Sequence, residues 1–391
     1  MNLKIRSVQL VPVAVARHTG YRCHHVIVRI RTEEGLEGIG EMSDFSHLPR
    51  YMPDLGDLQK VLNQLLAGRD ARDLNAIDQL MLENFPEAHY YYTKATFIRC
   101  GVDIALHDLV AKALGEPVST LLGGRCRDRF KVCYPIFRLR SVHEVEANLK
   151  IVAERLEQGF DVFRFYCGAN LDADEAFLKE LRAAFGEKVI IKSLDFSHLL
   201  DWKQARSAIR RLEKYGFLMV ESPAKPNDFE GLAKVREAID HPVSEHVWSH
   251  YALWQMIRHD SVDIFNIAPI FIGGLTAARR AFAAAAAAGK RCLIGTTQEL
   301  SVGVAAQAQL GAAMANLTDI SDPTGPELYV DDVVEEKVKY ENGYLLVPPA
   351  DVPGLGVSLS EEKLKALTEP MTWADVPVAN VLDRTGTAPK S

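Results

Sequence analysis

Three acidic residues lie at the ends of short apolar runs in the middle of the sequence, where they could bind a metal ion. Asp195 ends KVIIKSLD, Glu221 lies near the end of FLMVES, and Glu245 lies within PVSEHV. If these runs are neighbouring strands, the carboxylates would repel one another unless a cation lay between them. Oxygen ligands suit a hard divalent cation, so we expect Mg²⁺ first and Mn²⁺ second. The alternative is that each carboxylate only caps the following helix.

Residues near the same strand ends could carry acid–base chemistry. Tyr166 ends DVFRFY and shares a strand face with Arg164, whose guanidinium would favour the phenolate and make Tyr166 a candidate base. The alternative is that this pair only binds a substrate hydroxyl or carboxylate. His198, three residues after Asp195, is the second candidate, because a histidine can donate a proton at neutral pH. It could equally be a loop histidine bonded to the backbone.

Four further residues are candidate substrate contacts. Gln298 and Glu299 lie in GTTQELSVG, and His24 and His25 lie in the first loop of the N-terminal region. The alternatives are surface histidines and a glutamate buried against Arg or Lys.

Other polar residues have a structural interpretation. His246 directly follows Glu245, and alternation along a strand predicts that it points away from the acids. Asp103 and His107 lie one turn apart in a helical pattern, where we expect structural roles.

A repeating strand–helix pattern after Gly123-Gly124 must position these candidates. Short apolar runs recur about every 20 to 30 residues, and amphipathic stretches separate them; the runs begin near residues 131, 161, 188, 217, 242, 262, 290 and 317. Eight strands alternating with helices predict a parallel β/α barrel rather than an open sheet. The C-terminal ends of barrel strands lie on one face, which would gather the candidates.

The regions before and after the predicted barrel have different sequence patterns. Residues 1–128 are predicted to form an α+β module, with β-rich runs before a helical stretch over 57–87 and a helix over 93–114 that Gly115 ends. The barrel is expected over 129–335. Residues 336–391 contain a hairpin pattern around Asn342-Gly343 and should return to the N-terminal module. The final TGTAPKS is expected to be disordered.

Composition and charge limit the classes of partner and the cellular compartment that we expect. Lys and Arg number 45 against 52 Asp and Glu, a net charge of −7 without a basic tract, so nucleic acid is not expected as a partner. We find neither a signal-peptide pattern nor a run of about 18 apolar residues, so no membrane association is expected. The six cysteines are scattered, which is typical of a reducing cytoplasm.

Motifs along nearly the whole chain resemble the mandelate racemase and muconate lactonizing enzyme branch of the enolase superfamily. They are EGLEGIGE at 34–41, AKALGEPVSTLLGG at 111–124, SLDFSHLLDW at 193–202, VESP at 220–223, PVSEHVW at 242–248, DIFNIAPIFIGGLT at 263–276 and VPGLGV at 352–357. The resemblance implies an α/β fold, a modified TIM barrel of (β/α)7β type, with an α+β capping domain that the C-terminal segment completes. It also implies removal of the proton α to a carboxylate, with a metal-stabilised enediolate, and Asp195, Glu221 and Glu245 as metal ligands.

The sequence departs from the family pattern at the bases. The usual Lys-x-Lys of the second barrel strand is replaced by Arg164-Phe165-Tyr166, the second Lys or Asp of the sixth strand by Ala268, and GTTQELSVG holds no histidine. One face of the α-carbon therefore has no recognised base, which disfavours a racemase.

A one-sided acid–base fits elimination of water or a cycloisomerisation, and the polar replacements favour a polyhydroxy substrate. Dehydration of a sugar acid by a lyase is the leading hypothesis. The alternatives are a cycloisomerase or epimerase and a non-catalytic metal-binding member. A phosphate-binding barrel is disfavoured, because TDISDPTGPE at 318–327 lacks glycine-rich turns. We expect a small carboxylate substrate and a homo-oligomer.

Overall fold

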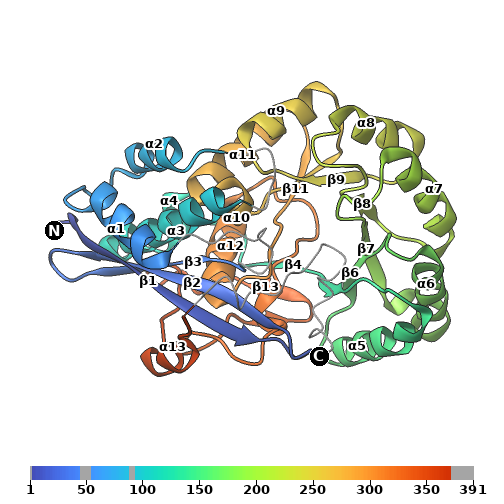
Figure 1. The fold of residues 1–391 in the computed structure, drawn as a ribbon, viewed down its shortest axis with the longest axis horizontal. Coiled ribbons are helices and arrows are strands. Elements are labelled where there is room, and N and C mark those ends of the chain that lie inside the picture. The colour runs from blue at the N-terminus through green and yellow to red at the C-terminus, as the bar shows by residue number, and fades with distance from the viewer. Residues whose placement is uncertain (1, 45–53, 88–92, 371–391) are drawn as a thin grey trace.

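The computed structural model describes residues 2–44, 54–87 and 93–370, and Figure 1 shows an antiparallel sheet on one side and a barrel on the other. The sheet consists of β1 (Ile5–Ala16), β2 (Arg22–Thr32) and β3 (Glu37–Met42) in that order. Helices α1 (Leu55–Leu66), α2 (Leu74–Asn84) and α3 (Lys94–Leu114) belong to the same N-terminal module. We call these elements the cap.

The longest cap helix has clear local signals at both ends. Thr93 accepts a hydrogen bond from the Thr96 N–H at the start of α3, and Gly115 ends it in the left-handed region with φ of 72°. The predicted helix over 93–114 is confirmed. The sheet approaches α3 so closely that a Cβ at Gly40 would lie 2.0 Å from the Gly101 carbonyl oxygen.

Seven parallel strands form the barrel wall. In spatial order they are β5 (Tyr134–Ile136), β6 (Val162–Tyr166), β7 (Ile190–Asp195), β8 (Met219–Glu221), β9 (Val243–His246), β10 (Ile264–Asn266) and β11 (Arg291–Leu293). Residues 317–321 fill the eighth position, because Leu317 bridges Cys292 and Ser321 bridges Val132, both in parallel. The predicted α/β barrel with an α+β cap is confirmed.

Helices cover the outside of the barrel (Figure 1). They are α5 (Val145–Glu157), α6 (Leu171–Phe185), α7 (Trp202–Leu212), α8 (Phe229–Ala238), α9 (His250–Arg258), α11 (Leu275–Ala287) and α12 (Ser301–Ala313), with the short α4 (Val118–Leu121) and α10 (Pro269–Ile272) at the junction with the cap. Single 3₁₀ turns are η2 (Val142–Glu144), η3 (Gly186–Lys188), η4 (Glu213–Tyr215) and η5 (Gly325–Glu327). No helix among the described residues combines the length and apolar character needed to cross a bilayer.

The C-terminal segment contacts both parts of the molecule. Its hairpin, β12 (Tyr340–Glu341) and β13 (Tyr344–Leu346), turns at Asn342-Gly343 and pairs with β4 (Arg129–Lys131). Further on, α13 (Glu361–Leu367) returns to the cap, where Glu361 forms an ion pair with Arg29 at 2.6 Å. The final TGTAPKS lies outside the described residues, and the domain boundaries at 128 and 335 stay predictions.

A cap carboxylate holds the start of a barrel helix. Asp103 on α3 accepts hydrogen bonds from the Leu275 N–H at 2.5 Å, the Thr276 N–H at 3.1 Å and the Thr276 hydroxyl at 2.6 Å. This contact requires Gly274, where φ is 126° and a Cβ would lie 2.5 Å from the Asp103 Cβ. Asp103 therefore satisfies first-turn N–H groups of α11, a structural role as expected.

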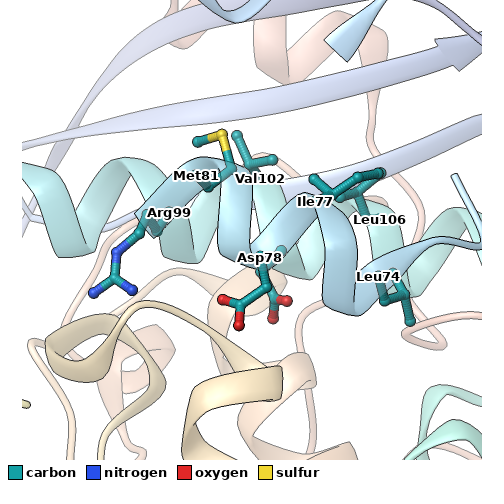
Figure 2. Close-up of a pocket in the computed structure, with 8 residues that line it drawn as sticks. Leu74, Ile77, Asp78, Met81, Arg99, Val102 and Leu106 are labelled. Atoms are coloured by element: carbon teal, nitrogen blue, oxygen red, sulfur yellow. The ribbon is translucent and has the colours of Figure 1, made fainter. Parts of the chain in front are cut away.

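A small pocket between α2 and α3 belongs to the same junction (Figure 2). Its lining is largely apolar, with Asp78, Arg99 and Asp103 as polar members; the labelled residues are Leu74, Ile77, Asp78, Met81, Arg99, Val102 and Leu106. Asp78 forms an ion pair with Arg280 on α11 at 2.5 Å, and Arg99 donates to the Ile272 carbonyl at 3.3 Å. The charged residues of this pocket thus fasten the cap to the barrel.

Replacing Asp103 with alanine should destabilise the protein, because first-turn N–H groups of α11 lose their acceptor at a buried junction. We expect the free energy of unfolding in urea to fall by about 1–3 kcal/mol. Asp172→Ala is the control: this carboxylate is 80% exposed and pairs with Arg211 on the surface, so its loss should cost less than about 1 kcal/mol. Equal stabilities of Asp103→Ala and wild type would contradict the assigned role.

Candidate active site

The candidate residues meet at the C-terminal ends of the central barrel strands. Tyr166 pairs with Asp195 across β6 and β7, Asp195 pairs with Glu221 across β7 and β8, and Glu221 pairs with Ser244 across β8 and β9. Paired residues in neighbouring strands point to the same side of a sheet. Tyr166, Asp195, Glu221 and Ser244 therefore share one face at one level.

Glu245 lies one residue out of this register. Because side chains alternate along a strand, its carboxylate belongs to the opposite face from Ser244. There it accepts hydrogen bonds from the Ser222 hydroxyl at 2.8 Å and from the His246 N–H at 2.7 Å, and its second oxygen contacts His198 Nε2 at 2.9 Å. The structure thus brings Asp195 and Glu221 together and holds Glu245 apart from them.

The prediction that His246 points away from the acids is wrong. Its Nε2 lies 3.2 Å from a carboxylate oxygen of Glu221. The reason is the register, because His246 is two residues from Ser244 and shares its face.

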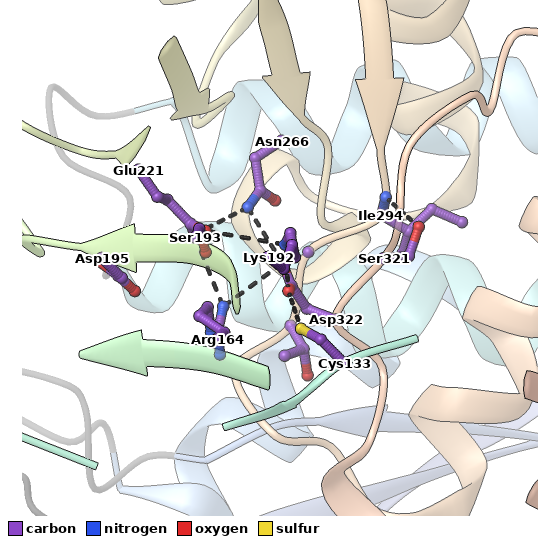
Figure 3. A network of polar contacts seen from close by, with 12 residues as sticks. Cys133, Arg164, Lys192, Ser193, Asp195, Glu221, Asn266, Ile294, Ser321 and Asp322 are labelled. Atoms are coloured by element: carbon purple, nitrogen blue, oxygen red, sulfur yellow. Dashed lines mark hydrogen bonds and ion pairs between the residues drawn. The ribbon is translucent and has the colours of Figure 1, made fainter. Parts of the chain in front are cut away.

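Glu221 is the most contacted acid of the site (Figure 3). Besides His246, it accepts hydrogen bonds from Asn266 Nδ2 at 3.0 Å and from the Ser193 hydroxyl at 3.3 Å. Two buried cations are also close, with Arg164 Nη1 at 3.6 Å and Lys192 Nζ at 3.8 Å. The Glu221 side chain is fully buried, so these donors replace the water it lacks.

A second buried acid, Asp322, completes this network and was not identified from the sequence. Lys192 Nζ lies 2.5 Å from one Asp322 oxygen, and Arg164 Nη1 lies 3.4 Å from the other. The Cys133 thiol donates to the same carboxylate at 3.1 Å. The available signal was a lysine inside the apolar run VIIKSL, since such a residue needs a buried partner.

The electrostatics of the two acids on the shared face differ. Burial by itself raises the pKa of Glu221, but Lys192 and His246 more than offset this and hold that pKa well below its usual range. Burial and the neighbouring Glu221 carboxylate raise the pKa of Asp195 to about 6. The protein's own cations therefore favour the charged form of Glu221 more than that of Asp195.

Tyr166 lies among aromatic and cationic groups at the end of β6. Its ring stacks on Phe137 with centroids 5.8 Å apart and an interplanar angle of 6°. The Arg164 guanidinium carbon lies 4.7 Å from the ring centroid, and that of Arg138 lies 5.6 Å away. The expected proximity of Arg164 is present, and Arg138, which follows β5, is a second guanidinium that sequence reasoning missed.

Arg138 connects to the acids through a serine. Its Nη2 donates to the Ser197 hydroxyl at 2.9 Å, and that hydroxyl donates to Asp195 at 2.9 Å. Its Nε donates to the Cys167 carbonyl at 3.2 Å. Among the residues that the structure describes, no carboxylate lies within ion-pair distance of Arg138, which is 6% exposed. A buried guanidinium without a carboxylate partner is costly unless an anion arrives.

Backbone strain is concentrated at this end of the barrel. Ser197, His198, Ser222 and Gln298 all have positive φ, between 45° and 74°. Non-glycine residues in this region store strain and cluster at functional sites. At Ser197 this conformation lets the N–H, as well as the hydroxyl, donate to Asp195.

The four predicted substrate contacts are buried in the junction between cap and barrel. His24 and His25 lie within β2 rather than in a loop. His25 Nδ1 contacts Glu41 at 2.9 Å; burial opposes its charge, but hydrogen bonds to Cys23 and Glu41 raise the pKa of His25 to about 10.

Gln298 and Glu299 follow β11. The backbone carbonyl of Gln298 accepts from the Tyr329 hydroxyl at 2.7 Å, and the Gln298 side-chain oxygen has no hydrogen-bond partner within the part of the chain that the structure describes. Glu299 accepts from the hydroxyls of Thr296 and Thr297 rather than from an Arg or Lys.

The three predicted metal ligands, Asp195, Glu221 and Glu245, do not lie together around one metal position. The shared face offers Asp195, Glu221 and the buried Ser244 hydroxyl, which has no hydrogen-bond partner among the described residues. Over residues 2–44, 54–87 and 93–370, no three His, Cys, Asp or Glu side chains are arranged to hold a metal ion. On this face Glu221 lies 3.6 Å from Arg164 Nη1 and 3.8 Å from Lys192 Nζ, and these two buried cations oppose a divalent cation beside it.

Comparisons with known proteins agree with this architecture. A profile described as the mandelate racemase/muconate lactonizing enzyme N-terminal domain matches residues 1–123, and one described as the enolase C-terminal domain-like family matches residues 148–363. The chain is 28% identical to L-Ala-D/L-Glu epimerase of Bacillus subtilis over 359 residues, which cover 88% of this chain and 92% of the relative.

Two further comparisons point the same way. Muconate cycloisomerase 1 of Pseudomonas putida is 29% identical over 363 residues, covering 90% of this chain and 92% of the relative. The structure of muconate lactonizing enzyme from Pseudomonas fluorescens complexed with muconolactone superposes with a TM-score of 0.84 at 25% identity, covering 94% and 100% of the two chains. This family is typically dependent on a divalent metal. The chain belongs to the mandelate racemase/muconate lactonizing enzyme family of the enolase superfamily.

Proposed function

We propose that the chain is an isomerase of the cycloisomerase type, which removes the proton α to the carboxylate of a small acid. The observation that carries this proposal is the position of Tyr166, half-buried at the end of β6, with the guanidinium carbons of Arg164 and Arg138 4.7 Å and 5.6 Å from its ring centroid. The similar epimerase and cycloisomerases support the reaction class.

Arg138 binds the substrate carboxylate in this proposal. A guanidinium has five N–H donors, and the described residues accept two hydrogen bonds from this one. The remaining N–H groups can donate to both carboxylate oxygens, as planar guanidiniums commonly do. When the α-proton leaves, its electron pair moves onto those oxygens, and the same donors stabilise the added charge.

Tyr166 is the base. As the phenolate it takes the α-proton through Oη, and the electron pair of the enediolate then breaks the carbon–oxygen bond at the neighbouring carbon, which opens the ring. In the ring-closing direction the carbon–oxygen bond forms first, and the Tyr166 hydroxyl then gives its proton to the α-carbon. The nearby guanidiniums of Arg138 and Arg164 favour the anionic oxygen. Because one group removes and returns one proton, the reaction needs acid–base chemistry on only one face of the α-carbon.

This one-sided arrangement favours cycloisomerisation over the other reactions considered. Epimerisation needs a second base on the opposite face, and the residue expected at the family's second base position is the fully buried Ala268, just after β10. Sugar-acid dehydration needs an acid for the leaving hydroxyl, and His198, the residue expected for that step, is held by Glu245 at 2.9 Å. The isomerase alternative is therefore preferred to dehydration.

Tyr166→Phe should lower the rate of α-proton exchange by about 100-fold or more, as expected for loss of a general base. The measurement is deuterium incorporation from D₂O by NMR, with muconolactone, cis,cis-muconate, L-Ala-L-Glu and N-succinyl-L-arginine as probes. Tyr251→Phe, on the outer surface of α9 with 55% exposure, is the matched control and should exchange like wild type. Exchange at the wild-type rate in Tyr166→Phe would rule out this base, and absence of exchange with every probe would contradict the proposed function.

Arg138→Gln should lower kcat/KM by about 10²- to 10³-fold through both kcat and KM, because the carboxylate loses its donor in the ground state and in the transition state. Arg138→Lys should recover only part of this loss, since an ammonium cannot bind both oxygens in the same way. Arg210→Gln, an exposed arginine on α7, is the control. A kcat/KM for Arg138→Gln within about twofold of wild type would exclude Arg138 from substrate binding.

A further inference from the structure

We propose that Lys192, together with Arg164, takes the place of the divalent cation of this family, so that the acids of this chain are neutralised by its own side chains. The proposal concerns the charges in the site and does not depend on which reaction the site catalyses.

An irregularity in β7 brings Lys192 into the barrel. Phe163 pairs with Ile191, but the next residue, Arg164, pairs with Ser193, so Lys192 is an extra residue in the strand. A β-bulge of this kind turns a side chain away from its regular side and is common next to active sites. Here it lets Lys192 reach Asp322 and Glu221 with no exposure to solvent (Figure 3).

The resulting group of charges is closed. Each of the two cations contacts both acids: Lys192 lies 2.5 Å from Asp322 and 3.8 Å from Glu221, and Arg164 lies 3.4 Å and 3.6 Å from them. Two positive and two negative side chains, all nearly fully buried, leave no net charge to be compensated. A divalent cation bound to Glu221 would be repelled by both neighbours in a weakly screened interior.

The remaining ligand positions agree with this inference. The face that Asp195 and Glu221 share has Ser244 at the third position, and a neutral hydroxyl is a weak substitute for a carboxylate. Glu245, the nearest further acid, already accepts hydrogen bonds from Ser222 and the His246 backbone and contacts His198. Neither residue supplies the third negative charge.

The test is calorimetric titration of the full chain with MgCl₂ and MnCl₂ after EDTA treatment, together with thermal unfolding in each solution. We expect no saturable binding up to about 10 mM, ten times the weakest dissociation constants of natural calcium-binding loops, and the same Tm with and without the cations. Stoichiometric binding with a Kd below about 1 mM that Glu221→Gln abolishes would overturn the proposal. This titration needs no variant of Lys192, so the outcome does not depend on whether such variants fold.

Two variants test the role of the lysine itself. Lys192→Gln should unfold at a lower temperature in EDTA, and MgCl₂ should raise its Tm, because Glu221 and Asp322 then lack one counter-charge. In Lys192→Gln/Ser244→Asp the shared face gains a third acid, and one Mn²⁺ per chain should bind. Lys203→Gln, which changes an exposed lysine on α7, is the control. A Tm of Lys192→Gln equal to that of wild type, with no response to MgCl₂, would refute the proposal.

Proton exchange separates this proposal from the proposed function. If the wild-type chain exchanges the α-proton of a probe, the rate should be unchanged in EDTA, and a loss of at least about 10-fold that MgCl₂ restores would count against Lys192 as the substitute cation. If no probe exchanges, the proposed function fails, whereas the titration still decides the identity of the counter-charge.

Discussion

The structure of the candidate site depends on the neutralisation of two fully buried carboxylates, Glu221 and Asp322. Moving such groups out of water costs several kcal/mol each unless charged and hydrogen-bonding partners replace the solvent. Lys192 and Arg164 provide the charge, and Asn266 donates to both acids at 3.0 and 3.3 Å. Arg164, Lys192 and Asn266 come from β6, β7 and β10, and Asp322 comes from the segment after β11. The same contacts therefore also fix how the barrel strands lie relative to one another.

At the junction between cap and barrel, buried carboxylates of the cap accept hydrogen bonds from the starts of barrel helices. Glu41 on β3 accepts from the N–H groups of Leu300 and Gly303 at the start of α12, as Asp103 does at the start of α11. Helix N-termini carry partial positive charge and unpaired N–H groups, so a carboxylate from the cap satisfies both. The cap is thereby attached to the helices after β10 and β11.

The architecture could be predicted from the sequence because its signals are local. Each strand–helix unit has its own apolar pattern, and α3 begins and ends at the predicted Thr93 and Gly115. The site could be predicted only in part. The positions of Tyr166, Asp195 and Glu221 at neighbouring strand ends follow from the repeat, but the register that places Ser244 rather than Glu245 beside Glu221 depends on pairing between distant segments. The only sequence signal of the bulge at Lys192 is a lysine within an apolar run.

A difference of one residue in position decides which face of a sheet an acid occupies. Side chains in a strand alternate with a period of two, so moving an acid by one position transfers its charge to the other face. In this chain the acid of β9 stands on the far face, while the bulge in β7 adds a positive charge to the near one. The position of the β9 acid and the bulge in β7 both make the shared face less negative. In the proposed reaction, a substrate carboxylate near Tyr166 would meet the guanidiniums of Arg138 and Arg164, and Arg138 would bind it.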